Sequence, residues 1–182
     1  MLPPPPPGSP LAPGATCAGK PATILARPGA TSVVGTAGPD VIVGSGAAER
    51  IDGRGGDDTI CAGAGADVVS GSAGNDVLLG DGGNDVVLGG TGNDDLRGLA
   101  GQDRLVGGAG RDRSDGGAGN DLLDEQGLNG AGRDRLLGGA GSDRVRTADR
   151  TADSIDCGAG SDNLVRDSVD RQAYCEHVRR AH

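Results

Sequence analysis

Aromatic side chains are almost missing from this chain of 182 residues. It contains no Trp, no Phe and a single Tyr, Tyr174. Aromatic rings dominate the burial of apolar surface in most globular cores. Their near absence excludes an ordinary globular core, although the length fits one domain. What remains is either a disordered Gly-rich and Asp-rich segment or a repetitive fold that holds a fixed phase.

Long apolar runs and excess positive charge are missing as well. No stretch approaches the ~18 apolar residues of a membrane-spanning helix. The 17 Lys and Arg residues are outnumbered by 26 Asp and Glu residues, which gives a net charge of −9. This balance disfavours nucleic acid and anionic membrane surfaces as partners, and it favours the binding of cations.

The sequence offers few residues for an active site. Its two His residues, His177 and His182, lie near the C-terminus, and neither HExxH nor GxSxG occurs. Residues 14–20, GATCAGK, imitate a phosphate-binding loop, but Pro21 stands where Ser or Thr should hold magnesium. Cys175 beside His177 could be a thiol nucleophile with its base, yet a disulfide next to a surface His is the simpler interpretation. We therefore expect no enzymatic activity.

Glycine is abundant instead, at 37 residues, far above average usage. Over residues 35–124 it alternates with acidic residues in a fixed period of nine. Two residues after each acid comes an aliphatic residue, with Ser114 as the exception. The acids of this run are Asp40, Glu49, Asp58, Asp67, Asp76, Asp85, Asp94, Asp103, Asp112 and Asp121.

A period of nine fits neither a helix nor a hairpin, but it matches the nonapeptide G-G-x-G-x-D-x-U-x of calcium-binding parallel β-rolls. The best copies are GDGGNDVVL (80–88), GGTGNDDLR (89–97) and GGAGNDLLD (116–124). At these residues the chain resembles the repeats-in-toxin (RTX) family, also called haemolysin-type calcium-binding repeats. The resemblance covers roughly residues 35–165. It implies an all-β, right-handed parallel β-roll in which two copies complete one coil and each calcium ion lies between neighbouring coils at one edge.

Elementary chemistry supports the same interpretation. Glycine allows a positive φ and lets carbonyl oxygens approach an ion, and carboxylates supply the hard oxygen ligands that calcium prefers. If copies alternate between two edges, acids stack at the strand spacing of about 4.7–4.9 Å. Two bare carboxylates at that spacing repel by about 3.5 kcal/mol at an effective dielectric constant of 20. One aliphatic side chain per copy contributes only about 1.5–3 kcal/mol, so we expect folding to depend on calcium.

We predict several calcium ions as the cofactor. The predicted metal-binding residues are Asp40, Asp58, Asp67, Asp76, Asp85, Asp94, Asp103, Asp112, Asp121, Asp134, Asp143 and Asp162, with the turn glycines Gly56, Gly65, Gly74, Gly83 and Gly92. The cleanest copies, and therefore the strongest expected sites, lie within 53–97. In the copy at 44–52, Ala47 replaces the turn glycine and Glu49 is one methylene longer than Asp. A distorted site and a metal-free turn are both open interpretations there.

The later repeats deviate from the pattern. From Arg97 onward Arg accumulates, either as a solvated outer face or as a replacement for calcium beside some of the Asp residues. Residues 125–128, EQGL, are an insertion of four that we expect in a surface loop. The pattern degrades over 147–156, where Asp153 and Ile155 fit a copy that comes one residue late.

The two ends differ from the repeats. We expect a Pro-rich disordered arm over 1–21, an N-terminal capping coil over 22–34, the roll over 35–165 and a C-terminal cap over 166–182. The C-terminal cap could be a short helix, with Tyr174 and Val178 on one face, or an irregular strand. The arm shows no recognisable signal peptide.

Four cysteines, Cys17, Cys61, Cys157 and Cys175, allow three disulfide pairings, and spacing alone does not choose among them. Relatives within the RTX family often carry such cysteines at both ends. We expect Cys17–Cys61 and Cys157–Cys175, because each bond would join a cap to the repeats. No CxxC occurs, which argues against zinc. Disulfides and millimolar free calcium both belong to the extracellular environment, so we expect a secreted protein.

The expected function is calcium binding coupled to the folding of a secreted, non-catalytic β-roll. Calcium ions are the expected partner, and a protein or surface partner stays unknown. The alternative is a calcium-rigidified adhesion or cell-surface interaction module, which would show self-association or ligand binding once folded.

Overall fold

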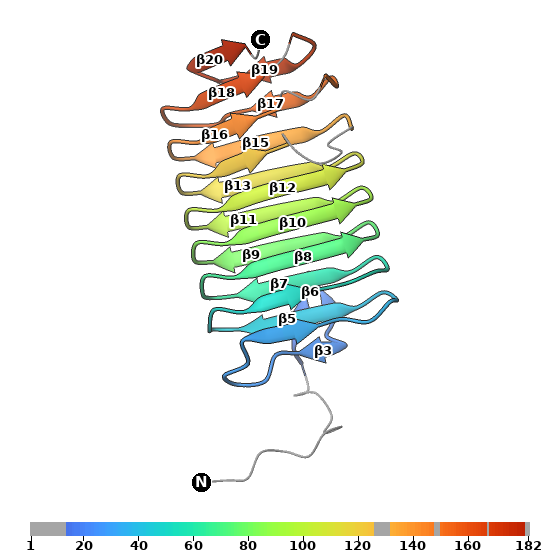
Figure 1. Cartoon of the computed structure of the whole chain (residues 1–182). Helices are drawn as coiled ribbons and strands as arrows, with labels where there is room; N and C mark the ends of the chain where they lie inside the picture. The colour runs from blue at the N-terminus through green and yellow to red at the C-terminus, as the bar shows by residue number, and fades with distance from the viewer. Residues whose placement is uncertain (1–13, 126–131, 148–149, 167, 181–182) are drawn as a thin grey trace, which may run out of the picture.

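Successive repeats place their strands in two different sheets. The computed structural model describes residues 14–125, 132–147, 150–166 and 168–180. Within these residues each of the two large sheets has nine strands, and neighbouring strands of a sheet are two repeats apart in the chain (Figure 1). The resulting fold is a parallel β-solenoid of about eight turns, which confirms the predicted fold class.

The strands are short, as a nine-residue repeat requires. One sheet consists of β3 (Ile24–Leu25), β5 (Val41–Ser45), β7 (Thr59–Gly63), β9 (Val77–Gly82), β11 (Asp95–Ala100), β13 (Arg113–Ala118), β15 (Arg135–Ala140), β17 (Ser154–Asp156) and β19 (Arg171–Ala173). The other consists of β4 (Ser32–Val34), β6 (Arg50–Asp52), β8 (Val68–Ala73), β10 (Val86–Thr91), β12 (Arg104–Ala109), β14 (Leu122–Asp124), β16 (Arg144–Arg146), β18 (Asn163–Arg166) and β20 (His177–Arg180).

The register between strands keeps equivalent repeat positions in line. Leu78 of β9 pairs with Leu96 of β11, two repeats further on. Between β13 and β15 the register still aligns Ser114 with Leu136, although the insertion of four residues falls between them in the sequence. Equivalent repeat positions therefore stay paired between strands even where extra residues interrupt the nine-residue period in the sequence.

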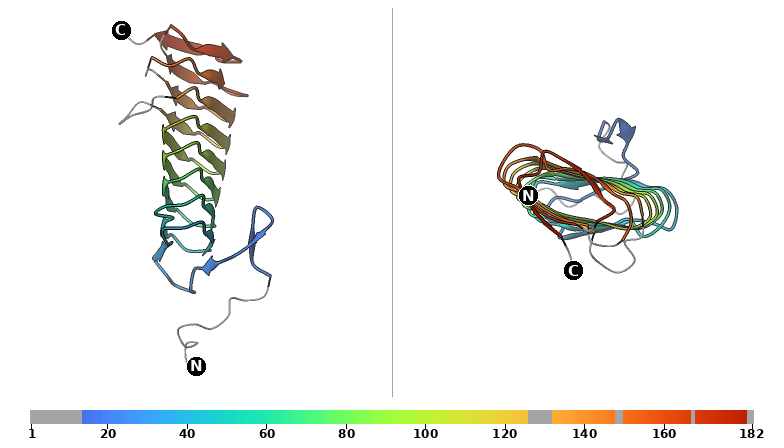
Figure 2. Two further views of the ribbon diagram at one scale, coloured as in Figure 1. Left: turned by 90° about the vertical axis from the view of Figure 1, so that its right-hand side faces the viewer. Right: turned by 90° about the horizontal axis from the view of Figure 1, so that it is seen from above.

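The core is a column of single aliphatic side chains, one from each repeat, between the two sheets. Viewed down the axis, the flattened coils superimpose on one another (Figure 2). The fully buried members are Ile42, Ile51, Ile60, Val69, Leu78, Val87, Leu96, Leu105, Leu123, Leu136, Val145 and Leu164, with Ile155 at 2 % exposure. Ser114 takes the place of an aliphatic residue and separates the column into two clusters.

The N-terminal end is held by a disulfide bond. Residues 14–21 belong to the predicted disordered arm (1–21), but in the structure β1 (Thr16–Cys17) and β2 (Lys20–Pro21) form an antiparallel hairpin. Figure 2 shows this segment standing outside the stack of coils. The Cys17–Cys61 bond joins it to β7. The rest of the expected arm, residues 1–13, lies outside the described residues.

The C-terminal end continues the solenoid. Strands β19 and β20 extend both sheets, so the proposed helical face of Tyr174 and Val178 is wrong. Tyr174 is 80 % exposed. The Cys157–Cys175 bond joins this end to the repeats, which confirms the second predicted pairing. Over the described residues, no helix has the length and apolar character needed to cross a membrane.

Candidate metal sites at the two edges of the solenoid

Two columns of buried acidic side chains run along the edges of the solenoid. In each column the backbone N–H of one acid donates a hydrogen bond to Oδ1 of the acid on the next coil, and this N···O distance is 2.8 Å from Asp76 to Asp94. One column contains Asp40, Asp58, Asp76, Asp94, Asp112, Asp134, Asp153 and Asp170. The other contains Glu49, Asp67, Asp85, Asp103, Asp121, Asp143 and Asp162. Every Asp that the sequence predicts as a metal ligand lies in one of these columns.

The second carboxylate oxygen, Oδ2, is buried in most of these residues. Within the described part of the chain it has no hydrogen-bond partner in Asp58, Asp67, Asp76, Asp85, Asp94, Asp103, Asp112, Asp121, Asp143 and Asp162. Buried polar atoms are nearly always paired, and an exception calls for an explanation such as an ion. A repeated exception on this scale indicates a site built for a positive charge.

Glycine makes room for these oxygens five residues before each Asp. A Cβ atom placed on Gly80 would lie 2.6 Å from Oδ2 of Asp85 and 3.0 Å from the carbonyl oxygen of Gly98 on the next coil. Asp oxygens and carbonyl oxygens meet in the same way at Gly53, Gly71, Gly89, Gly98 and Gly116. Side-chain and backbone oxygens from two neighbouring coils therefore converge at one point.

The predicted turn glycines serve the stacking of the coils. Gly92 has φ +130°, and a Cβ atom on it would lie 2.6 Å from the carbonyl carbon of Gly74. Positive φ and close contact with the preceding coil recur at Gly56, Gly65, Gly74 and Gly83. Only glycine combines this backbone conformation with such a close approach. These residues are thus required for the coil spacing that brings the acids together.

Burial disfavours the charged form of the column carboxylates. It raises the pKa of Asp58, Asp85, Asp94, Asp112 and Asp121 to about 6. Neighbouring acids add to the effect, and the pKa of Asp58 is raised further by Asp76 and Asp40. The pKa values of Asp67, Asp76, Asp103 and Asp143 shift in the same direction, again mainly through burial. The ion-free columns therefore carry electrostatic strain that a cation would relieve.

The N-terminal acids of the columns have protein partners instead. Oδ2 of Asp40 accepts hydrogen bonds from the backbone N–H of Thr36 at 2.7 Å and from its hydroxyl at 2.9 Å. The Glu49 carboxylate accepts bonds from the backbone N–H and hydroxyl of Ser45. At Gly44, Oε2 of Glu49 also meets the carbonyl oxygen of Ala62, so the distorted site and the metal-free turn both stay predictions for this copy.

The columns extend further toward the C-terminus than the regular repeats predict. Asp153, expected in a late copy, accepts the N–H of Asp134 at 2.9 Å. Asp170 was missed, although Oδ1 accepts the N–H of Asp153 at 3.2 Å and Oδ2 accepts the Thr147 hydroxyl at 2.9 Å. Its copy lacks glycine and carries Gln172 where an aliphatic residue belongs. In the sequence, only the acid itself and its distance from the preceding acid of the column indicate that Asp170 belongs there.

Glu125 contradicts the predicted surface loop. Its side chain is 1 % exposed, and its carboxylate accepts hydrogen bonds from the Gly107 N–H and the Ser114 hydroxyl, each at 3.2 Å. It lies beside the inward position that Ser114 leaves under-filled. Burial raises the pKa of Glu125 to about 8, with added repulsion from Asp134 and Asp112. The other three residues assigned to the insertion, 126–128, lie outside the described residues.

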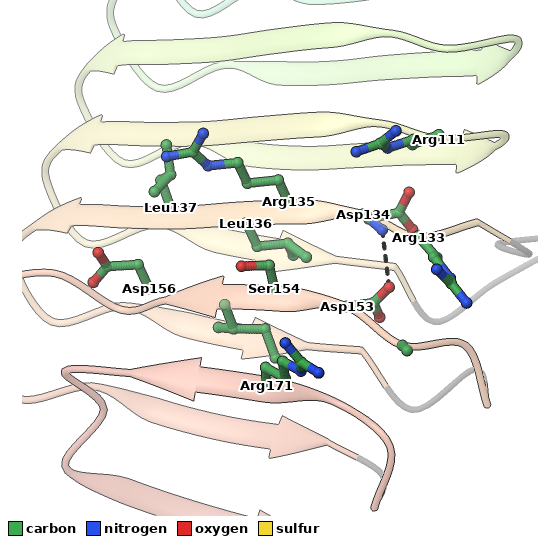
Figure 3. Close-up of a pocket in the computed structure, with 12 residues that line it drawn as sticks. Arg111, Arg133, Asp134, Arg135, Leu136, Leu137, Asp153, Ser154, Asp156 and Arg171 are labelled. Carbon is green, nitrogen blue, oxygen red and sulfur yellow. Dashed lines mark hydrogen bonds between the residues drawn. The ribbon is translucent and has the colours of Figure 1, made fainter.

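Arginines of the later repeats lie on the outer face. Arg97 pairs with Asp95 at 2.6 Å, and Arg113 pairs with Asp95 at 2.9 Å and with Asp115 at 2.7 Å. For these two residues the outer-face interpretation is right. Further arginines, Arg111, Arg133, Arg135 and Arg171, line a depression of about 690 Å³. Figure 3 shows these side chains, with the hydrogen bond between Asp134 and Asp153 dashed.

The donor set at the edges fits calcium. Each step presents carboxylate and carbonyl oxygens, and calcium takes about 6–8 such ligands. The described residues contain no group of three or more His, Cys, Asp or Glu side chains arranged to hold a metal ion. An ion at one of these steps would therefore take backbone carbonyl oxygens as ligands beside the carboxylates.

Comparison with known families agrees with this geometry. The family model of the RTX calcium-binding nonapeptide repeat, which spans four copies, matches residues 26–60, 52–87, 62–96, 88–123 and 130–149. No curated protein gives a significant match. The matched segments cover more than half of the chain and contain the acids of both columns from Asp40 to Asp143. The chain therefore belongs to the family of RTX calcium-binding nonapeptide repeats.

Proposed function

We propose that this protein binds several calcium ions along both edges of the solenoid and that their binding drives its folding. The ligands would be the column aspartates, through Oδ2, together with backbone carbonyl oxygens of the glycine turns. Ions between neighbouring coils would link consecutive steps of each column.

The buried, unpartnered Oδ2 atoms carry this proposal. At a typical step, Oδ2 of Asp85 and the carbonyl oxygen of Gly98 face the same small space beside Gly80. Both are hard oxygen donors, and they come from adjacent coils. A divalent ion between them would replace the repulsion of neighbouring carboxylates by attraction to a shared cation.

Coupling to folding is supported by the small core. Each repeat except the one with Ser114 buries a single aliphatic side chain over the regular run 35–124, which contributes about 1.5–3 kcal/mol. Ordering nine residues costs about 1–2 kcal/mol for each residue. Because the sites require two assembled coils, the free energy of ion binding adds directly to the free energy of folding.

We further propose a secreted, non-catalytic protein. The two disulfide bonds suit an oxidising compartment, where calcium is also abundant. Cys175 is bonded to Cys157, so the thiol nucleophile considered for it has no free sulfur. The buried acids occur at the repeat phase, which suits metal ligation better than paired acid–base work.

The direct test is a calcium titration of the oxidised protein followed by far-UV circular dichroism and by calorimetry. We expect a coil-like spectrum in chelator, a β spectrum on addition of calcium, and binding of several ions. Asp76→Asn combined with Asp94→Asn should lower the ion count, whereas Asp115→Asn on the outer face should not. An unchanged β signal in chelator without any heat of binding would refute the proposal.

A further inference from the structure

Glu125 gives one step of a column a composition that other described steps lack. It lies 18 residues after Gly107, at the position where most of the other coils carry glycine. A Cβ atom on Gly107 would lie 2.6 Å from Oδ2 of Asp112 and 2.9 Å from Oε2 of Glu125. At the Gly80 step the second oxygen is the backbone carbonyl of Gly98. At the Gly107 step the second-nearest oxygen is instead a carboxylate oxygen of Glu125, which can carry a negative charge.

The surroundings of Glu125 concentrate negative charge in a buried place. Its hydrogen-bond donors are neutral, namely the Gly107 N–H and the Ser114 hydroxyl. None of the described Lys or Arg residues forms an ion pair with it. Asp112 is 2 % exposed, and its Oδ2 has no hydrogen-bond partner among the described residues. Buried carboxylates this close together need a counter-charge to stay ionised.

We propose that Asp112 and Glu125 form a distinct divalent-cation site that binds calcium more tightly than the other steps. This inference rests on the proposed function, because it assumes that the columns hold calcium. Affinity in oxygen-ligand sites increases with the number of charged ligands and with the rigidity of the site. Glu125 adds one full negative charge, and its bonds to Gly107 and Ser114 hold that charge in place.

The test compares calcium isotherms of the full-length oxidised protein and of Glu125→Gln at about pH 9, where the Glu125 carboxyl is ionised. The wild-type protein should show one tight site followed by a class of weaker ones. Glu125→Gln keeps the size of the side chain, and we expect it to weaken binding of the first ion at least about tenfold. Glu125→Asp, which retains the charge on a shorter side chain, should recover part of that loss. Glu176→Gln, in an exposed part of the C-terminal segment, is the matched control and should behave as the wild type.

Each outcome separates this inference from the proposed function. If the Glu125→Gln isotherm superimposes on that of the wild type, Glu125 is not a ligand, and the tight site is refuted while calcium binding stands. If the wild-type protein takes up no calcium at all, the proposed function fails and the inference fails with it. Circular dichroism in saturating calcium shows whether the variant folds. If it does not, Asp112→Asn decides, because Asp112 is the other proposed ligand, and an isotherm of that variant that keeps the tight site overturns the proposal.

Discussion

Replacing Asp94 by Asn should have opposite effects with and without calcium. Asp94 lies in the middle of its column, bonded through Oδ1 to the Asp76 N–H and through its own N–H to Asp112. Asparagine keeps the Oδ1 acceptor and removes the charge. Its amide group would face the carbonyl oxygen of Gly107, which lies beside the place of Oδ2. The substitution thus changes charge while preserving shape.

Without calcium the variant should be the more stable protein. Removing one carboxylate abolishes its repulsion from a neighbour on either side, each about 3.5 kcal/mol at the strand spacing and a dielectric constant of 20. Solvent and salt screen part of this, so we expect a gain of about 2–4 kcal/mol. Because the ion-free wild type should be largely unfolded, the gain is measured as a lower concentration of the stabilising osmolyte trimethylamine N-oxide needed to restore the β spectrum.

With calcium the sign should reverse. Each ion that binds only the folded state contributes about 1.4 kcal/mol at ten times its dissociation constant and about 2.7 kcal/mol at a hundred times. Losing a carboxylate weakens the ions on both sides of Asp94, so urea midpoints in excess calcium should fall. Asp115→Asn, on the outer face, should show no such reversal. A change of the same sign in both buffers would show that Asp94 is not a ligand and would refute the reasoning.

Three further predictions concern pH, disulfides and glycine. Because burial raises the pKa of Asp58, Asp85, Asp94, Asp112 and Asp121 to about 6, the folded ion-free protein binds more protons than the unfolded chain. The stability of the folded ion-free protein should therefore increase as pH falls from about 6 toward 4. Circular dichroism spectra recorded without calcium at each pH measure this, and a loss of β signal over that range would contradict the prediction. Replacing Cys157 and Cys175 by Ser removes a cross-link between residues 18 positions apart. It should lower the free energy of unfolding by about 3 kcal/mol, measured by urea unfolding in calcium. An unchanged urea midpoint would mean that the disulfide bond restricts the unfolded chain very little. Gly92→Ala should lower the free energy of unfolding by more than about 2 kcal/mol, as other strained core substitutions do. Gly82→Ala should leave it nearly unchanged, because a Cβ atom there meets nothing within 4 Å. Equal effects of the two substitutions would exclude a role of Gly92 in the stacking of the coils.

The regular part of the molecule could be predicted from the sequence because one period fixes both fold and site. Residues two positions apart in an extended chain point to the same side, so a single phase assigns Asp94 to the buried edge and Leu96 to the core. The pairing of strands two repeats apart follows from the same phase.

The irregular part could not be predicted, for physical reasons that the structure makes visible. Glu125 is polar and adjoins a break in phase, which in sequence indicates a surface loop, yet a polar gap at Ser114 allows it to be buried. Asp170 lacks the glycine that marks a turn, and its place is set by contacts with Thr147 and Asp153. Both depend on the three-dimensional neighbourhood rather than on local pattern.

The interruption of the aliphatic column at Ser114 has a thermodynamic consequence. Each of the two clusters has its own disulfide bond, Cys17–Cys61 on one side and Cys157–Cys175 on the other. In a linear array stability is a sum of local terms and nearest-neighbour terms, so a weak junction lowers cooperativity across it. When calcium is scarce, we expect the coils on the two sides of Ser114 to unfold in separate steps. We expect them to unfold as one cooperative unit only when the ions beside Ser114 are bound.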